Sequence, residues 1–227
     1  MSRALLVFAK TPIAGTVKTR LAGALGAEGA QHLYAAFVRD LAERLGTLSQ
    51  LGGAGIRIRW HVSPDPEPLR TLVGDGDLLN QTGSSLGARM CAAFDSATNE
   101  GYESVVIIGT DTPTLELATI LQAFEMLKEP GQAVIGPAED GGYYLLGLRG
   151  VSPAFLEAIT YSKSDVRSLT AAMLTSAGHS VAYLPEMFDV DLPEDVARLQ
   201  ALLEENPSLA PSTARLLRHS KASGRQS

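Results

Sequence analysis

The chain has 227 residues, of which 45% are hydrophobic and 19% charged, as in an ordinary globular protein. Its net charge of −6 argues against a general nucleic-acid binder, and a single cysteine excludes an internal disulfide. Because no apolar run reaches the roughly 18–20 residues of a membrane span and no secretion signal is visible, we expect a cytoplasmic protein without a membrane span or a nucleic-acid partner.

Short apolar runs alternate with helical patterns along the first half of the chain. The run ALLVFA is continuous and apolar, which is typical of a buried strand, and a polar loop follows it over residues 10–20. The elements expected in this half are strands over 4–9, 56–62 and 77–81, and helices over 28–48, 69–73 and from 86 onward.

The second half continues the alternation. Pro113 predicts the start of a helix that runs to about residue 128, because proline is favoured in a first helical turn. The other elements expected are strands over 104–109, 132–136, 143–148 and 180–184, a turn over 139–142, and helices over 165–177 and 193–205. We expect one folded domain over residues 1–206, followed by a flexible basic tail over 207–227.

Strands that alternate with helices predict an α/β fold with a mostly parallel sheet covered on both faces. Ligands of such sheets bind beyond the carboxyl ends of the strands, at the point where the strand order reverses. Three polar segments follow predicted strands, over residues 10–20, 110–113 and 139–142. They are where we expect the chemistry.

The loop after the first strand is rich in cations. It carries Lys10, Lys18 and Arg20, bends at Gly15, and leaves the strand at Ala9. It lacks the second glycine of a P-loop, and the dinucleotide fingerprint GxGxxG is absent. Its amides and cations could still neutralise nucleotide phosphates. An ordinary connection with exposed cations is the alternative.

Acidic residues follow the clearest buried strand and precede the helix over 193–205. Asp111 could supply a carboxylate to Mg²⁺, or it could cap the helix expected at Pro113. Asp189 and Asp191 lie on one side of an extended segment, so either could be a second metal ligand, and one could instead cap the following helix. Of the two, we slightly favour Asp189 as the ligand.

Two glycine-containing segments complete the candidates. Gly83 and Gly87 flank a helix start, where amides can hold an anion or a base edge, and Arg89 lies off the apolar stripe of that helix. Capping is the alternative. The segment Asp140-Gly141-Gly142 is either a turn between strands or a place where a substrate approaches the backbone closely.

Five motifs in one order carry a family resemblance, namely VFAKTPIAGTVKTRLA, SLGARM, VVIIGTDTPTL, GPAEDGGYYLLGL and DVDLPEDV. Together they resemble a bacterial glycosyltransferase-like family that is associated with radical-SAM and selenium-domain proteins or with arsenosugar biosynthesis. That family is similar to the nucleotide-diphospho-sugar transferase superfamily. The resemblance implies a single glycosyltransferase-A-like three-layer sandwich with a mostly parallel mixed sheet.

The resemblance also implies roles for individual residues. Lys18 and Arg20 would meet phosphates, and residues 83–89 would lie near the base or ribose. Asp111 takes the place of the acid in the superfamily's DxD-type motif and would bind Mg²⁺ or Mn²⁺, with Asp189 or Asp191 as its partner. Asp140 resembles, more loosely, the catalytic base of inverting glycosyltransferases.

The main expectation is therefore a metal-dependent glycosyltransferase that uses a nucleotide-sugar and a small-molecule acceptor. A guanylyltransferase-like nucleotidyltransferase is the first alternative, and it would use a nucleoside triphosphate and a small phosphorylated acceptor. A non-catalytic nucleotide-binding module is the second. The sequence leaves the base, the sugar, the acceptor and the oligomeric state open.

Overall fold

The computed structural model describes residues 2–74, 76–161 and 165–223, which form one seven-stranded sheet in the order β3-β2-β1-β4-β6-β5-β7. The predicted strands are all present. Their bounds are β1 (Arg3–Lys10), β2 (Ile56–Ser63), β3 (Asp77–Asn80), β4 (Ser104–Ile108), β5 (Gln132–Pro137), β6 (Tyr143–Arg149) and β7 (Ser180–Tyr183).

The sheet is mixed but mostly parallel. Strand β1 pairs in parallel with β2 and β4, and β7 pairs in parallel with β5. Strand β6 is antiparallel to both of its neighbours, β4 and β5. The physical reason is the predicted turn over 139–142, since so short a connection can join only antiparallel strands. The predicted α/β fold with a mostly parallel mixed sheet is confirmed.

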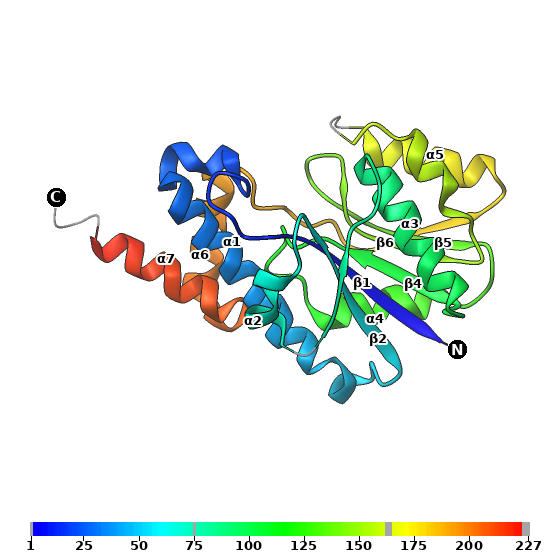
Figure 1. The fold of residues 1–227 in the computed structure, drawn as a ribbon, viewed down its shortest axis with the longest axis horizontal. Coiled ribbons are helices and arrows are strands. Elements are labelled where there is room, and N and C mark those ends of the chain that lie inside the picture. Colours follow the sequence, from blue (N-terminus) through cyan, green and yellow to red (C-terminus); the bar gives the residue numbers. More distant parts are fainter. Residues whose placement is uncertain (1, 75, 162–164, 224–227) are drawn as a thin grey trace.

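Helices cover both faces of the sheet, which gives three layers (Figure 1). Alternate β1 residues point to opposite faces: Leu5 and Val7 join the core with helix α1, whereas Leu6 joins the core with α3. The helices are α1 (Ala22–Gly46), α2 (Arg70–Val73), α3 (Leu86–Asn99), α4 (Leu117–Met126), α5 (Val166–Ser176), α6 (Pro193–Glu205) and α7 (Pro211–Ser223). None of the helices that the structure describes is long and apolar enough to cross a membrane.

Helix α1 begins earlier than predicted but is interrupted. Gly26 has φ 72° and ψ 163°, which is outside the helical region and is accessible to glycine because it has no side chain. The predicted start at residue 28 therefore marks the beginning of the uninterrupted part of the helix.

The helix predicted over residues 113–128 is present, but its predicted start at Pro113 is wrong. Helix α4 begins at Leu117, and Glu116 occupies its N-cap position. The preceding residues form a turn that Arg44 anchors, because its guanidinium donates to the carbonyls of Pro113 (3.0 Å) and Leu115 (2.6 Å). Asp111 therefore lies well before the helix and does not cap it.

The prediction of a flexible tail from residue 207 is also wrong for the described part of that segment. Residues 207–209 form a short 3₁₀ helix, and α7 packs against α1. Ala210, Ala214 and Leu217 are buried at helical spacing, so this segment has an apolar face in addition to its basic residues. Residues 224–227 lie outside the described residues, so the tail predicted there stays a prediction.

A buried carboxylate fixes the start of α7. Asp40 of α1, only 2% exposed, accepts hydrogen bonds from the backbone N–H of Ser212 (2.7 Å), and from the N–H (2.9 Å) and hydroxyl (2.6 Å) of Thr213. The carboxylate satisfies helix N-terminal amides that have no partner inside the helix. It does so from another helix rather than from the N-cap position.

We expect Asp40→Ala to lower the free energy of unfolding by about 2–4 kcal/mol, because it removes a cap and leaves buried donors unpaired. Urea denaturation followed by circular dichroism measures the change. Glu43→Ala, at an exposed position of the same helix, is the matched control and should change it by less than about 0.5 kcal/mol. Equal effects of the two substitutions would contradict a capping role for Asp40.

Candidate functional site

A cavity of about 790 Å³ opens at the carboxyl ends of β1 and β4. The chain leaves β1 toward β2 and β3 on one side, and β4 lies on the other side of β1. The strand order therefore reverses between β1 and β4, which is the place where open α/β sheets bind their ligands. The polar loops predicted after these two strands both contribute to its lining.

Most of the residues predicted from the sequence line this cavity. They are Ala9, Lys10, Lys18, Arg20, Arg89, Asp111, Asp140, Gly142, Asp189 and Asp191. Gly15, Gly83, Gly87 and Gly141 are not among its lining residues. Gly87 instead lets α3 approach the 3₁₀ helix over 153–158, because a Cβ there would lie 2.1 Å from the carbonyl oxygen of Leu156.

The ammonium group of Lys18 is the centre of the site. Its side chain is only 3% exposed, and its Nζ forms ion pairs with Asp111 and with Asp191, the latter at 2.9 Å. Burial alone would lower the pKa of Lys18, but the two carboxylates raise it above its ordinary value, so the group stays charged. Its backbone has φ 47°, a left-handed conformation that is uncommon for residues other than glycine.

The segment between β7 and α6 brings two more acids to the end of β4. The N–H of Val190 donates to the carbonyl of Asp111 (2.9 Å), so Asp189 and Asp191 lie beside the β4 loop. Neither carboxylate caps α6, because Leu192 occupies its N-cap position; the N–H groups of Asp191 (3.0 Å) and Leu192 (2.7 Å) donate to Asp195. The capping alternative is therefore wrong for Asp189 and Asp191.

The two acids differ in their surroundings. Asp191 shares Lys18 with Asp111, whereas Asp189 accepts a hydrogen bond from the hydroxyl of Thr112. Burial raises the pKa of Asp189 to about 7; the Thr112 hydrogen bond opposes this, while the nearby Asp111 and Asp140 add to it. Among the described residues, no group of three or more His, Cys, Asp or Glu side chains is assembled as a metal site.

Tyr34 of α1, which the sequence pattern did not single out, links the end of β1 to the loop after β4. Its buried hydroxyl accepts the N–H of Lys10 (2.7 Å) and shares a hydrogen bond with the hydroxyl of Thr110 (2.8 Å). Burial raises the pKa of Tyr34 to about 12, so it stays neutral. Its position beside the apolar stripe of α1 resembled that of a core residue, and only the fold reveals its second role.

Gln81 is a second residue that the sequence analysis missed. It follows β3 directly and lines the cavity. Its amide donates to the carbonyls of Ala9 (3.0 Å) and His61 (2.9 Å), which joins the ends of β1, β2 and β3. Its place at the carboxyl end of a predicted strand was the available signal.

The segment over 139–142 is a turn that also faces the cavity. The N–H of Ala138 donates to the carbonyl of Gly142 (3.1 Å), and the N–H of Gly142 donates to Oδ1 of Asp140 (2.8 Å). One oxygen of Asp140 therefore stabilises the turn while the side chain lines the site.

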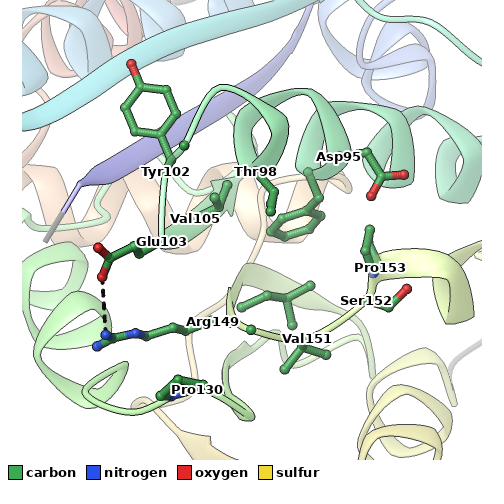
Figure 2. A pocket seen from close by; sticks show the side chains of 14 residues that line it. Asp95, Thr98, Tyr102, Glu103, Val105, Pro130, Arg149, Val151, Ser152 and Pro153 are labelled. Carbon is green, nitrogen blue, oxygen red and sulfur yellow. Dashed lines mark hydrogen bonds and ion pairs between the residues drawn. The ribbon is translucent and has the colours of Figure 1, made fainter.

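A second cavity, of about 620 Å³, lies beside the start of β4 and the end of β6, at the opposite end of these strands from the first cavity (Figure 2). Glu103 and Arg149 form an ion pair across it at 3.3 Å, and Arg149 also donates to the carbonyl of Leu127 (3.1 Å). These contacts hold the end of β6 to the start of β4. Within the described chain, its lining includes none of the residues predicted from the sequence.

Comparison with known proteins identifies the family. Residues 39–163, more than half of the chain, match the model of a family described as "Uncharacterized protein conserved in bacteria (DUF2064)". The chain belongs to the DUF2064 family. It is also 33% identical over 203 residues to a protein of Rubrobacter xylanophilus named phosphoenolpyruvate guanylyltransferase, a match that covers 86% of this chain and 94% of the relative.

Solved structures agree with this assignment. A "putative nucleotide-diphospho-sugar transferase" from Desulfovibrio desulfuricans superposes with a TM-score of 0.89 at 32% identity, over 100% of this chain and 98% of that one. A cytidylyltransferase from Leptospira borgpetersenii shares the fold alone, with a TM-score of 0.58 at 12% identity over 99% of this chain and 96% of its own. The predicted nucleotide-diphospho-sugar transferase fold is confirmed, and the predicted transferase class agrees with both relatives above 30% identity.

The raised pKa of Asp189 predicts a dependence of stability on pH. A carboxyl group whose pKa is raised on folding disfavours the folded state once it ionises, so metal-free protein should lose stability as the pH rises from about 4 through 7. Asp189→Asn cannot ionise and should melt on the order of 5 °C higher than the wild type at pH 8 in EDTA, with a smaller gain at pH 4.5.

The matched control is Asp191→Asn, which removes a carboxylate that pairs with buried Lys18 and should lower the melting temperature at pH 8. Thermal melts of the wild type, Asp189→Asn and Asp191→Asn at both pH values measure these changes in melting temperature. A gain for Asp189→Asn that does not change with pH would rule out the burial of an ionised carboxylate as its cause.

Proposed function

We propose that the chain is a nucleotidyltransferase that moves a nucleoside monophosphate, guanylate in the first instance, from a triphosphate to a small phosphorylated acid. Phosphoenolpyruvate is the first acceptor to test. The observation that carries the proposal is the meeting of Lys18, Asp111 and Asp191 inside the cavity at the reversal of the strand order. This arrangement combines a buried cation and two carboxylates where a metal–triphosphate complex would need both.

The carboxylates fit a hard divalent cation. The side chains of Asp111 and Asp191 remain 48% and 44% exposed although each pairs with Nζ of Lys18, and those pairs use only Oδ1 of each carboxylate. Mg²⁺ is commonly held by one or two carboxylates with substrate phosphates completing its shell. Asp111 and Asp191, with Asp189 beside them, would hold Mg²⁺ or Mn²⁺. The cation would neutralise part of the negative charge on the phosphate oxygens.

The loop after β1 supplies further positive charge that would balance the negative charge of the phosphates. Lys18, Arg20 and Lys10 line the cavity and would bind the phosphates by charge-assisted hydrogen bonds. An oxygen of the acceptor phosphate attacks the α-phosphorus, the bond to the β-phosphate oxygen breaks, and pyrophosphate leaves. Because the attacking phosphate is already ionised, this reaction needs no general base.

The relatives support this choice over glycosyl transfer. The Rubrobacter relative is named a guanylyltransferase, and a guanylyl donor with a phosphorylated acceptor suits a cavity rich in cations. Glycosyl transfer stays the second candidate, because the Desulfovibrio relative is described as a nucleotide-diphospho-sugar transferase and Asp140 lines the cavity where a base could act.

The two reactions release different products. With GTP, phosphoenolpyruvate and Mg²⁺, we expect the protein to release pyrophosphate, measured by a coupled phosphate assay and by mass spectrometry of the guanylylated product. Release of a nucleoside diphosphate from a nucleotide-sugar, with no pyrophosphate from any triphosphate, would instead favour the glycosyl reaction. Asp111→Asn should lower turnover at least about 100-fold, because it removes a carboxylate that would hold the cation on the phosphates.

Lys18→Ala tests the phosphate contact. Loss of a charge-assisted hydrogen bond should weaken GTP binding about 10- to 100-fold, whereas guanosine binding should change little, because guanosine has no phosphate. Isothermal titration calorimetry compares the two ligands. A loss of the same size for GTP and guanosine would show that Lys18 does not contact phosphate.

A further inference from the structure

The wall of the cavity made by β3 and α3 carries two polar side chains that the phosphate chemistry does not use. Gln81 follows β3, and Arg89 lies in the first turn of α3. Both line the same cavity as Lys18. If the cavity holds a nucleotide, as proposed above, its base needs a wall away from Asp111 and Asp191, and this wall is available.

The amide of Gln81 has a fixed orientation. Its Nε2 lies 3.0 Å from the carbonyl oxygen of Ala9 and 2.9 Å from that of His61. A carbonyl oxygen only accepts hydrogen bonds, so the amide nitrogen must face both of them. Both amide hydrogens are thereby used, and Oε1 is held on the opposite side as an oriented acceptor.

Arg89 places a donor beside that acceptor. Its Nε donates to the carbonyl of Gly83 (3.1 Å), which holds the guanidinium against the loop before α3. Its Nη1 lies 3.4 Å from Oε1 of Gln81 and 3.4 Å from Oγ of Ser63. These contacts are long for hydrogen bonds, so a ligand with better geometry can take them over.

A donor next to an acceptor distinguishes nucleobases by their edges. Guanine presents the acceptor O6 beside the donor N1–H, and uracil presents O4 beside N3–H. Adenine and cytosine present the reverse, an amino donor beside a ring-nitrogen acceptor. An amino base would therefore set donor against donor at Arg89 and acceptor against acceptor at Gln81, which leaves polar groups unpaired. Leu86, 45% exposed on the same wall, offers an apolar surface for the face of a base.

We propose that Gln81 and Arg89 select an oxo base, so that the cavity binds guanine and uracil nucleotides in preference to adenine and cytosine nucleotides. The full-length protein with Mg²⁺ is titrated calorimetrically with GTP, ITP, UTP, ATP and CTP. We expect GTP and ITP to bind about 10- to 100-fold more tightly than ATP, and UTP to exceed CTP similarly. ITP lacks the 2-amino group of guanine, so it isolates the edge that the two residues contact.

Two variants assign the preference to these residues. Gln81→Met and Arg89→Met should bring the affinity ratio of GTP to ATP close to one. Arg20→Met, in the loop after β1, should weaken all five nucleotides by one common factor. Gln200→Met on α6, outside the cavity lining, repeats the change made at Gln81 and should alter nothing.

Nucleotide binding without base preference in the wild type would overturn this inference and leave the proposed function standing. Equal weakening of GTP and ATP by both variants would also overturn it. Failure of the wild type to bind any triphosphate would overturn the inference and the proposed function together. Should Gln81→Met fail to fold, Arg89→Met and the wild-type order of affinities decide.

Discussion

The buried ammonium of Lys18 is the constraint on which the site depends. It lies between Asp111 and Asp191, which come from the loop after β4 and from the segment before α6. An unpaired ammonium at this depth would be costly, because burial in a low dielectric penalises an isolated charge. The ion pairs therefore fix three segments that are far apart in the chain against one another.

The backbone conformation of Lys18 is part of the same constraint. A left-handed φ is rarely adopted by lysine, and it persists where the surrounding contacts outweigh its cost. Here the ion pairs and the ring of Phe37, 5.8 Å from the ammonium, provide those contacts. Tyr34 adds a neutral link between the end of β1 and the loop after β4. The carboxyl ends of β1 and β4 are therefore held together by both ion pairs and uncharged hydrogen bonds.

The sequence predicted the strands and the polar ends well because both follow local rules. Continuous apolar runs marked β1 and β4, and the polar residues after them line the cavity. The family resemblance implied that Asp189 or Asp191 lies near Asp111, but local sequence could not predict that Asp191 shares Lys18 with Asp111, since this depends on how distant segments meet. Tyr34 and Gln81 line the cavity but have ordinary local patterns, so spacing alone did not single them out.

The two errors in the helices have one cause. Pro113 is a good first residue for a helix, yet Arg44 of α1 binds the carbonyls of Pro113 and Leu115 and holds that stretch as a turn. The basic residues of α7 suggested a solvated tail, yet the helix has an apolar face and receives a cap from Asp40. In both places a tertiary contact from α1 decided what the local sequence left undetermined.

The cap at Asp40 has a consequence for how the protein is made. Asp40 and Thr213 are 173 positions apart, and so are Lys18 and Asp191. During synthesis from the amino end, α1 and the loop after β1 emerge long before the residues that neutralise or cap them. A nascent chain that ends before Asp191 thus holds Lys18 without that partner, and one that ends before α7 holds Asp40 without the amides that it caps, so the site and the core are completed only when the last part of the described chain folds.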